Sequence, residues 1–144
     1  MFICCSVTRS AEACSSEGLD CQHVALSIRG KGKVQISDNV IKLCDIGIQA
    51  LDQSTPIIRS NIMDNMLLCC LLVEGSGTKP SIVNNVLSGG SQESQTGAAG
   101  GVGLLCLDEA GGLVGKNIFQ VLSRCYSIVT KKYICLGLGS VPTF

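Results

Sequence analysis

The sequence has 144 residues, about the length of a single domain. Apolar residues make up 46% of the chain, but it has only two Tyr, three Phe and no Trp, so a core must be built from aliphatic residues and Cys. Charged residues reach only 15%, which excludes a disordered chain, a coiled coil and a highly charged helix bundle. The formal net charge of zero gives no support for binding to nucleic acid or to an anionic membrane surface.

Residues 1–20 form an N-terminal segment of their own and a candidate cap. Its opening stretch, Met1–Val7, is a short apolar run that no basic residue precedes, so it lacks the pattern of a secretory signal. The longest uninterrupted apolar run, Met66–Val73, is too short to span a membrane. We therefore expect a cytoplasmic or nuclear protein with no membrane partner.

The ten cysteines do not form a recognisable metal or disulfide pattern. No Cys-x-x-Cys occurs, and Cys21 with His23 is an isolated pair at a spacing that common zinc modules do not use. Disulfide scaffolds of secreted proteins are usually much shorter chains. We expect thiols that pack in the core, no metal site and no cofactor.

Residues 21–144 contain an internal repeat. An aliphatic residue, two spacers, Asn, one spacer and a second apolar residue recur four times, with the Asn residues 22, 24 and 32 positions apart. The four copies are Ile36–Ile41, Ile58–Met63, Ile82–Leu87 and Val114–Phe119. A second apolar block follows the first three copies, at Gly47–Asp52, Cys69–Glu74 and Gly103–Asp108. The third copy is longer because a Gly, Ser and Gln-rich loop is inserted at 91–101.

The repeat predicts an all-β fold. Apolar residues alternate with a period of two over short runs, which indicates two or three short strands in each copy. A period of about 22 residues with strands at fixed offsets is typical of a coil whose turns stack as parallel strands. We therefore predict a right-handed parallel β-helix, a single-stranded solenoid of four to five turns. A leucine-rich repeat has a similar period, but its Leu-x-x-Leu-x-Leu-x-x-Asn phrase does not fit these positions.

Stacking predicts rows of inward side chains that run from turn to turn. The expected rows are Ile36, Ile58, Ile82 and Val114; Ile41, Met63, Leu87 and Phe119; Ile48, Cys70 and Leu104; and Ala50, Leu72 and Cys106. The repeated Asn residues should form a further row at a corner, where Asn tolerates left-handed backbone angles and its amide can bond to the Asn of the next turn. That row is Asn39, Asn61, Asn85 and Asn117.

Three segments carry a resemblance to a known family: Gly30–Asn39, Ser54–Asn61 and Gly112–Phe119. Over roughly residues 24–120 the sequence resembles the β-helix repeats of the F-box-only right-handed β-helix proteins and, more loosely, the pectate-lyase superfamily. The first resemblance implies a non-catalytic scaffold that recognises another protein, with substrate recognition in a ubiquitin ligase as its context. The second implies, as the alternative, part of a carbohydrate-active or carbohydrate-binding protein.

Carboxylates on successive turns are the feature that would support catalysis. Asp52, Glu74 and Asp108 share one offset in the aligned repeats, and adjacent turns would hold neighbouring carboxylates about 5 Å apart, near the separation in a retaining glycosidase. However, each follows a strand, where an exposed acidic turn residue is ordinary, and the chain lacks an aromatic platform for a sugar ring. We expect no enzyme activity and assign no catalytic residue.

Strand alternation predicts an apolar strip on the outer face of one sheet. Leu51, Leu71, Val73, Leu105 and Leu107 should point outward there, with Asp52, Glu74 and Asp108 as a polar rim. Contiguous exposed apolar patches usually mark interaction sites, so these eight residues are the candidate partner-binding site. The open end turns of the coil predict self-association as a second kind of contact.

Overall fold

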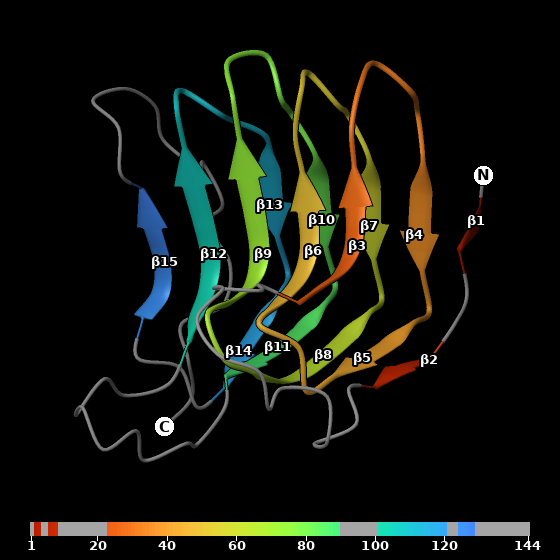
Figure 1. Cartoon of the computed structure of the whole chain (residues 1–144), viewed down its shortest axis with the longest axis vertical. Coiled ribbons are helices and arrows are strands. Elements are labelled where there is room, and N and C mark those ends of the chain that lie inside the picture. Colours follow the sequence, from red (N-terminus) through yellow and green to blue (C-terminus); the bar gives the residue numbers. More distant parts are fainter. Residues whose placement is uncertain (1, 4–5, 9–22, 90–100, 121–123, 129–144) are drawn as a thin grey trace, which may run out of the picture.

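The computed structural model describes residues 2–3, 6–8, 23–89, 101–120 and 124–128. Its strands form three five-stranded sheets, which we call the back, bottom and front sheets after their places in Figure 1. The back sheet contains β1 (Phe2–Ile3), β4 (Gln35–Ser37), β7 (Ile57–Arg59), β10 (Ser81–Val83) and β13 (Leu113–Gly115). The bottom sheet contains β2 (Ser6–Thr8), β5 (Val40–Lys42), β8 (Ile62–Met66), β11 (Val86–Gly89) and β14 (Ile118–Gln120). The front sheet contains β3 (Val24–Ile28), β6 (Ile46–Ala50), β9 (Cys69–Glu74), β12 (Val102–Leu107) and β15 (Arg124–Ile128).

The chain visits the back, bottom and front sheets in the same order in every turn. The strand pairs of the described residues are parallel, and each strand pairs with the equivalent strand one turn away. The result is a coil of about four turns whose axis crosses Figure 1 from right to left. The predicted all-β parallel β-helix is confirmed.

The inward rows predicted for the back and bottom sheets are confirmed. Ile36, Ile58 and Ile82 are in register, at most 1% exposed, and Val114 continues their row. The matching bottom-sheet row is Ile41, Met63, Leu87 and Phe119, of which the first three are fully buried. Aliphatic side chains therefore stack at the strand spacing, which is how a chain with few aromatic residues fills its core.

The predicted register of the front sheet is wrong in β9, the front-sheet strand of the second copy of the repeat. Ile48 pairs with Leu71, not Cys70, and Ala50 pairs with Val73, not Leu72. Leu71 and Val73 are each 1% exposed and belong to the core, so they do not point outward as the sequence predicted.

One extra residue causes this change of register. Six positions separate Met63 from Cys69, whereas five separate the equivalent Ile41 from Ile46. The surplus residue lies in β8, where the pairing with β11 shifts register and Asn65 has a positive φ of 60°. A one-residue insertion in a strand exchanges its two faces, so every later position in this turn moves by one.

The predicted Asn row is confirmed at the corner between the back and bottom sheets. Asn39, Asn61, Asn85 and Asn117 are 0–4% exposed, and each of the first three bonds the side-chain oxygen of the next through its backbone N and its Nδ2. The expected left-handed backbone angle does not belong to the Asn itself: the residue before each Asn has it, with φ between 54° and 61°. These amides satisfy corner backbone groups that the sheets leave without partners.

Other predictions fall partly on residues outside the described ranges. They concern the cap at residues 1–20, the inserted loop at 91–101 and the far end turn. Within residues 1–20, β1 pairs with β4 and β2 pairs with β5, so these two strands extend the back and bottom sheets.

Gly47 is expected to be essential because it lies at the close approach of two turns. A Cβ there would lie 2.5 Å from the Cys70 carbonyl oxygen and 3.0 Å from the Met63 Sδ. We expect Gly47→Ala to reduce the free energy of unfolding by about 2–3 kcal/mol, because the backbone of β9 must shift. Gly115→Ala is the matched control in urea denaturation, since a Cβ at Gly115 meets no atom within 4 Å. Equal stability of the two variants would contradict this packing.

Candidate functional site

The outer face of the front sheet carries apolar residues that are separate from the core. They form a second cluster, which we call the outer cluster. Its members are Val24, Ile46, Cys69, Leu72, Val102, Leu105 and Leu107. Two rows run through it from turn to turn: Val24, Ile46, Cys69 and Val102, and then Ser27, Gln49, Leu72 and Leu105. This face therefore becomes more apolar from β3 towards β12.

The outer cluster agrees only in part with the strip predicted from the sequence. Leu105 and Leu107 are half-buried members of it, as expected. Leu51 is only 7% exposed, while Leu71 and Val73 lie in the core. Leu72, which the sequence placed inward, packs in the outer cluster instead. Ile46 and Cys69 were not recognised as outward, because strict alternation puts Ile46 on the face of Ile48, whereas the strand pairing skips Gly47 and Cys70 and so interrupts the alternation.

The acidic residues do not stand in one row. Asp52 and Asp108 lie in tight turns. Ser54 N donates to the Leu51 carbonyl oxygen in the first turn, and Ala110 N donates to the Leu107 carbonyl oxygen in the second, both at 3.0 Å. Both carboxylate residues are exposed, with left-handed φ values of 54° and 51°. Glu74 pairs with Leu107 rather than with Asp108. The prediction that the three carboxylates share one offset is therefore wrong, because Glu74 is one position out of register with Asp108.

These turns nevertheless place charge beside the outer cluster. Asp52 and Asp108 follow β6 and β12, and Glu74 ends β9 at the same edge of the front sheet. Asp52 lies 3.8 Å from an Arg29 guanidinium nitrogen in an exposed ion pair. Such a pair contributes little to stability because water and salt screen it. Acidic residues therefore lie at the carboxyl ends of the front-sheet strands, next to the apolar side chains of the outer cluster.

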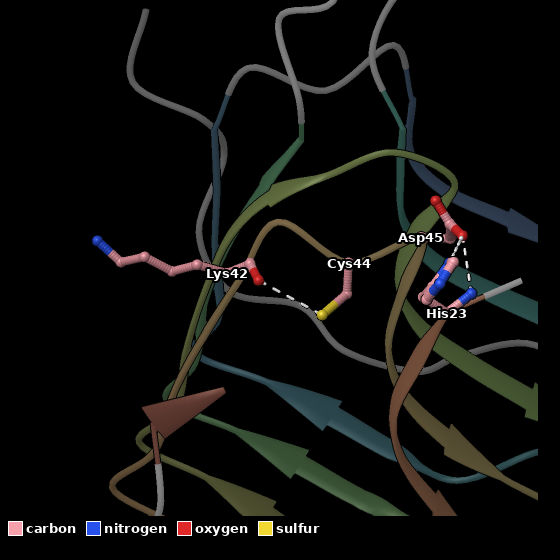
Figure 2. Close-up of polar contacts among 4 residues, drawn as sticks. All are labelled: His23, Lys42, Cys44 and Asp45. Carbon is pink, nitrogen blue, oxygen red and sulfur yellow. Dashed lines mark hydrogen bonds and ion pairs between the residues drawn. The ribbon is translucent and has the colours of Figure 1, made fainter. Parts of the chain in front are cut away.

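His23 and Asp45 form a polar contact between the first two strands of the front sheet that the sequence analysis missed. Figure 2 shows both lying at the start of their strands, with Cys44 turned toward Lys42. The Asp45 carboxylate accepts from the His23 backbone N at 2.7 Å and lies 3.2 Å from its ring Nδ1. The Cys44 thiol donates to the Lys42 carbonyl oxygen at 3.4 Å. The pair is one repeat period apart, 22 residues, and that separation was the available signal.

The two adjacent thiols of β9 are buried on opposite faces. Cys69 packs in the outer cluster, while Cys70 packs in the core and its thiol donates to the Ser88 carbonyl oxygen at 3.6 Å. Burial raises the pKa of each thiol to about 12, and the neighbouring Cys69 adds to the shift at Cys70. Since the thiolate is the nucleophile and the metal ligand, neither cysteine is prepared for chemistry at neutral pH.

These raised pKa values predict a loss of stability in alkali. An unfolded thiol with a pKa of 9.0 releases its proton as the pH rises above about 9, whereas the folded thiol keeps it up to about 12. The folded state then binds more protons, so the free energy of unfolding falls with pH by up to about 1.4 kcal/mol per pH unit for each thiol. Urea denaturation at pH 8 to 10.5 measures this slope. The Cys69→Ala/Cys70→Ala variant should show a shallower slope, and an unchanged slope would contradict the prediction.

Neither a metal cluster nor a membrane-crossing helix is found in the part of the chain that the structure describes. No group of three His, Cys, Asp or Glu side chains there is placed to hold a metal ion. No helix among the same residues is long and apolar enough to cross a bilayer.

Comparison with known proteins assigns the chain to a family. Neither a curated protein nor a solved structure matches it. A family model described as "Right handed beta helix region" matches residues 4–130, which is most of the sequence. The match agrees with the three parallel sheets and the turn-by-turn register of their strands. The chain therefore belongs to the right-handed β-helix family.

Proposed function

We propose that this β-helix is a non-catalytic scaffold that binds another protein through the outer face of its front sheet. The observation that carries the proposal is the outer cluster, which is distinct from the core: Ile46, Cys69 and Leu72 are at most 7% exposed, and partly exposed side chains on β12 continue it. Leu105 and Leu107 keep part of their surface exposed on β12. Half-buried aliphatic residues next to a polar edge are typical of the central part of a protein interface.

The charges beside this surface indicate the chemistry of the partner. Asp108 and Glu109 follow Leu107 directly and are both exposed, and Glu74 is half-buried one turn away. An apolar segment flanked by Lys or Arg would place its side chains on Leu105 and Leu107 and its charges on these carboxylates. Complementary rim charges mainly raise the association rate and the specificity, so this binding should weaken as salt increases.

Substrate recognition in a ubiquitin ligase is the narrower form of the proposal. It rests on the resemblance of the repeats to those of the F-box-only β-helix proteins. In this form, the partner on the front sheet is a ligase substrate. Association with a ligase adaptor would then depend on residues outside the front sheet, so substitutions in the outer cluster should leave that association intact.

A binding assay with matched variants tests the proposal. Partners are identified by pull-down and mass spectrometry, and the purified partner is then titrated against each variant. Leu105→Lys/Leu107→Lys should lower the affinity at least tenfold while circular dichroism stays unchanged. Leu113→Lys, at an exposed position on the back sheet, should bind as the wild type does. Equal binding by both variants would reject this surface, and polysaccharide cleavage by the purified wild type would reject a non-catalytic role.

A further inference from the structure

The outer face of the bottom sheet carries a continuous row of aliphatic residues that are exposed or half-buried. The row contains Val40, Ile62, Val86 and Ile118, which are in register on β5, β8, β11 and β14. Ile62 is 44% exposed and Ile118 is 52% exposed. All four side chains are β-branched and therefore have restricted χ1 rotamers, so little side-chain entropy is lost when they are covered. We call this row the bottom ridge.

A polar row runs along the corner beside the bottom ridge. It contains Asp38, Ser60, Asn84 and Lys116, one residue for each turn, two positions before the ridge residue of the same turn. All four are exposed, and all four have left-handed φ values between 54° and 61°. The negative charge therefore stands at one end of the row and the positive charge at the other, with two neutral residues between them.

The charges of this corner row are complementary to those of the same row read in the opposite order. A two-fold axis parallel to the strands, passing between β8 and β11, brings a second copy face to face with the order of turns reversed. Ile62 then faces Val86 of the second copy, and Val40 faces Ile118. The same rotation places Asp38 opposite Lys116 at both ends of the corner row and Ser60 opposite Asn84. From this symmetry we propose that the chain forms a two-fold homodimer through its bottom ridge.

The charges on both sides of the ridge distinguish this arrangement from the other two-fold rotation. On the far side from the corner row stand Lys42 and Asp64, which form an exposed ion pair at 3.7 Å, followed by Ser88 and Gln120. In the reversed order Lys42 faces Gln120 and Asp64 faces Ser88, so no like charges meet. If the second copy were instead turned about the ridge itself, Asp38 would face Lys42, which already pairs with Asp64, and Lys116 would face Gln120 without an opposite charge. The reversed order alone gives Lys116 an acidic partner.

The contact is small, so the dimer should be weak and dependent on concentration and salt. One apolar row with a polar row on each side covers less surface than a standard stable interface. The two Asp38 to Lys116 contacts lie at the exposed ends of the interface. Salt weakens them there, because the Debye length is only about 10 Å at 0.1 M ionic strength. Self-association should thus decrease as salt rises. It uses the side of the coil, whereas the end-turn association predicted from the sequence would use its ends.

Sedimentation velocity over a range of concentrations tests the proposal on the full chain. The wild type should shift from monomer to dimer as its concentration rises at low salt. Ile62→Lys, which adds a charge at the centre of the ridge, should weaken dimerisation at least tenfold with no change in circular dichroism. A wild type that stays monomeric, or an Ile62→Lys variant that dimerises equally well, would overturn the proposal.

A charge exchange tests the reversed order itself. Lys116→Asp alone should weaken the dimer about tenfold, because Asp38 of each copy would then face a second carboxylate instead of an ammonium group. Adding Asp38→Lys in the same chain should restore the wild-type affinity. Both changes use residue types that already occupy this left-handed corner, so the backbone cost is matched. Failure of the double variant to recover, with each single variant fully folded, would reject this arrangement of the two copies.

Discussion

Replacing Leu71 by Lys is expected to unfold the protein, whereas the same change at Leu105 is expected to leave it folded. Leu71 is 1% exposed and pairs with Ile48 and Leu104 in the core. A lysine there loses the burial of the leucine and places an ammonium group among aliphatic side chains. We expect the free energy of unfolding to fall by at least about 4 kcal/mol, a large fraction of the stability of a typical domain.

Leu105 provides the matched comparison because it directly follows Leu104, the partner of Leu71, and lies on the opposite face of the front sheet. It is half-buried in the outer cluster, where a lysine can lay its methylene chain on the apolar surface and keep its charge in water. The expected change is within about 1 kcal/mol. Urea denaturation followed by circular dichroism measures both variants. A folded Leu71→Lys variant would show that Leu71 faces solvent.

Asn61→Ala should be as damaging as Asn85→Ala and more damaging than the same change at either end of the Asn row, because these two inner residues bond to the turns on both sides. The Asn61 Nδ2 lies within 3.0 Å of the carbonyl oxygens of Ile36 and Arg59 and of the Asn85 Oδ1. Its Oδ1 accepts from the Asn39 backbone N at 3.1 Å and from the Asn39 Nδ2 at 2.9 Å. Alanine leaves several of these buried groups without a partner, so we expect a loss of about 3–4 kcal/mol.

The other positions give graded controls for this measurement. Asn117→Ala should cost less, because Asn117 is 4% exposed whereas Asn61 is fully buried, so water can reach the groups that the substitution leaves without a partner. Gln49→Ala, on the outer face of the front sheet, should have little effect, since its bond to Ser27 is exposed. An Asn61→Ala variant as stable as Gln49→Ala would mean that the amide row does not hold the corner together.

The sequence was sufficient to predict most of the coil because two independent patterns agree. The Asn corner fixes the start of each bottom-sheet strand, and the alternation on either side of it gives unambiguous inward positions such as Ile58 and Met63. Both patterns depend on polar residues between the apolar ones. Where polar residues punctuate each strand, period and phase are both visible.

The front sheet could not be placed in the same way. Met66–Val73 is apolar throughout, so alternation does not show which of its residues point inward. Aligning Glu74 with the two aspartates then gave a register that is wrong by one residue. The extra residue near Asn65 changes the length of the bottom-sheet segment without interrupting the hydrophobic pattern. Leu71 and Val73 were consequently assigned to the surface, while Leu105 and Leu107, on a strand that has no extra residue, were placed correctly.

The register of β9 with β6 and β12 is the central claim, because it decides which residues form the core and which form the outer cluster. Nuclear Overhauser effects between backbone amide and Hα protons report directly which residues face one another on neighbouring strands. Uniformly labelled protein should show contacts that link Ile48 to Leu71 and Val73 to Cys106. Contacts that link Ile48 to Cys70 and Leu72 to Cys106 instead would contradict the assigned register, the outer cluster and the binding surface proposed on it.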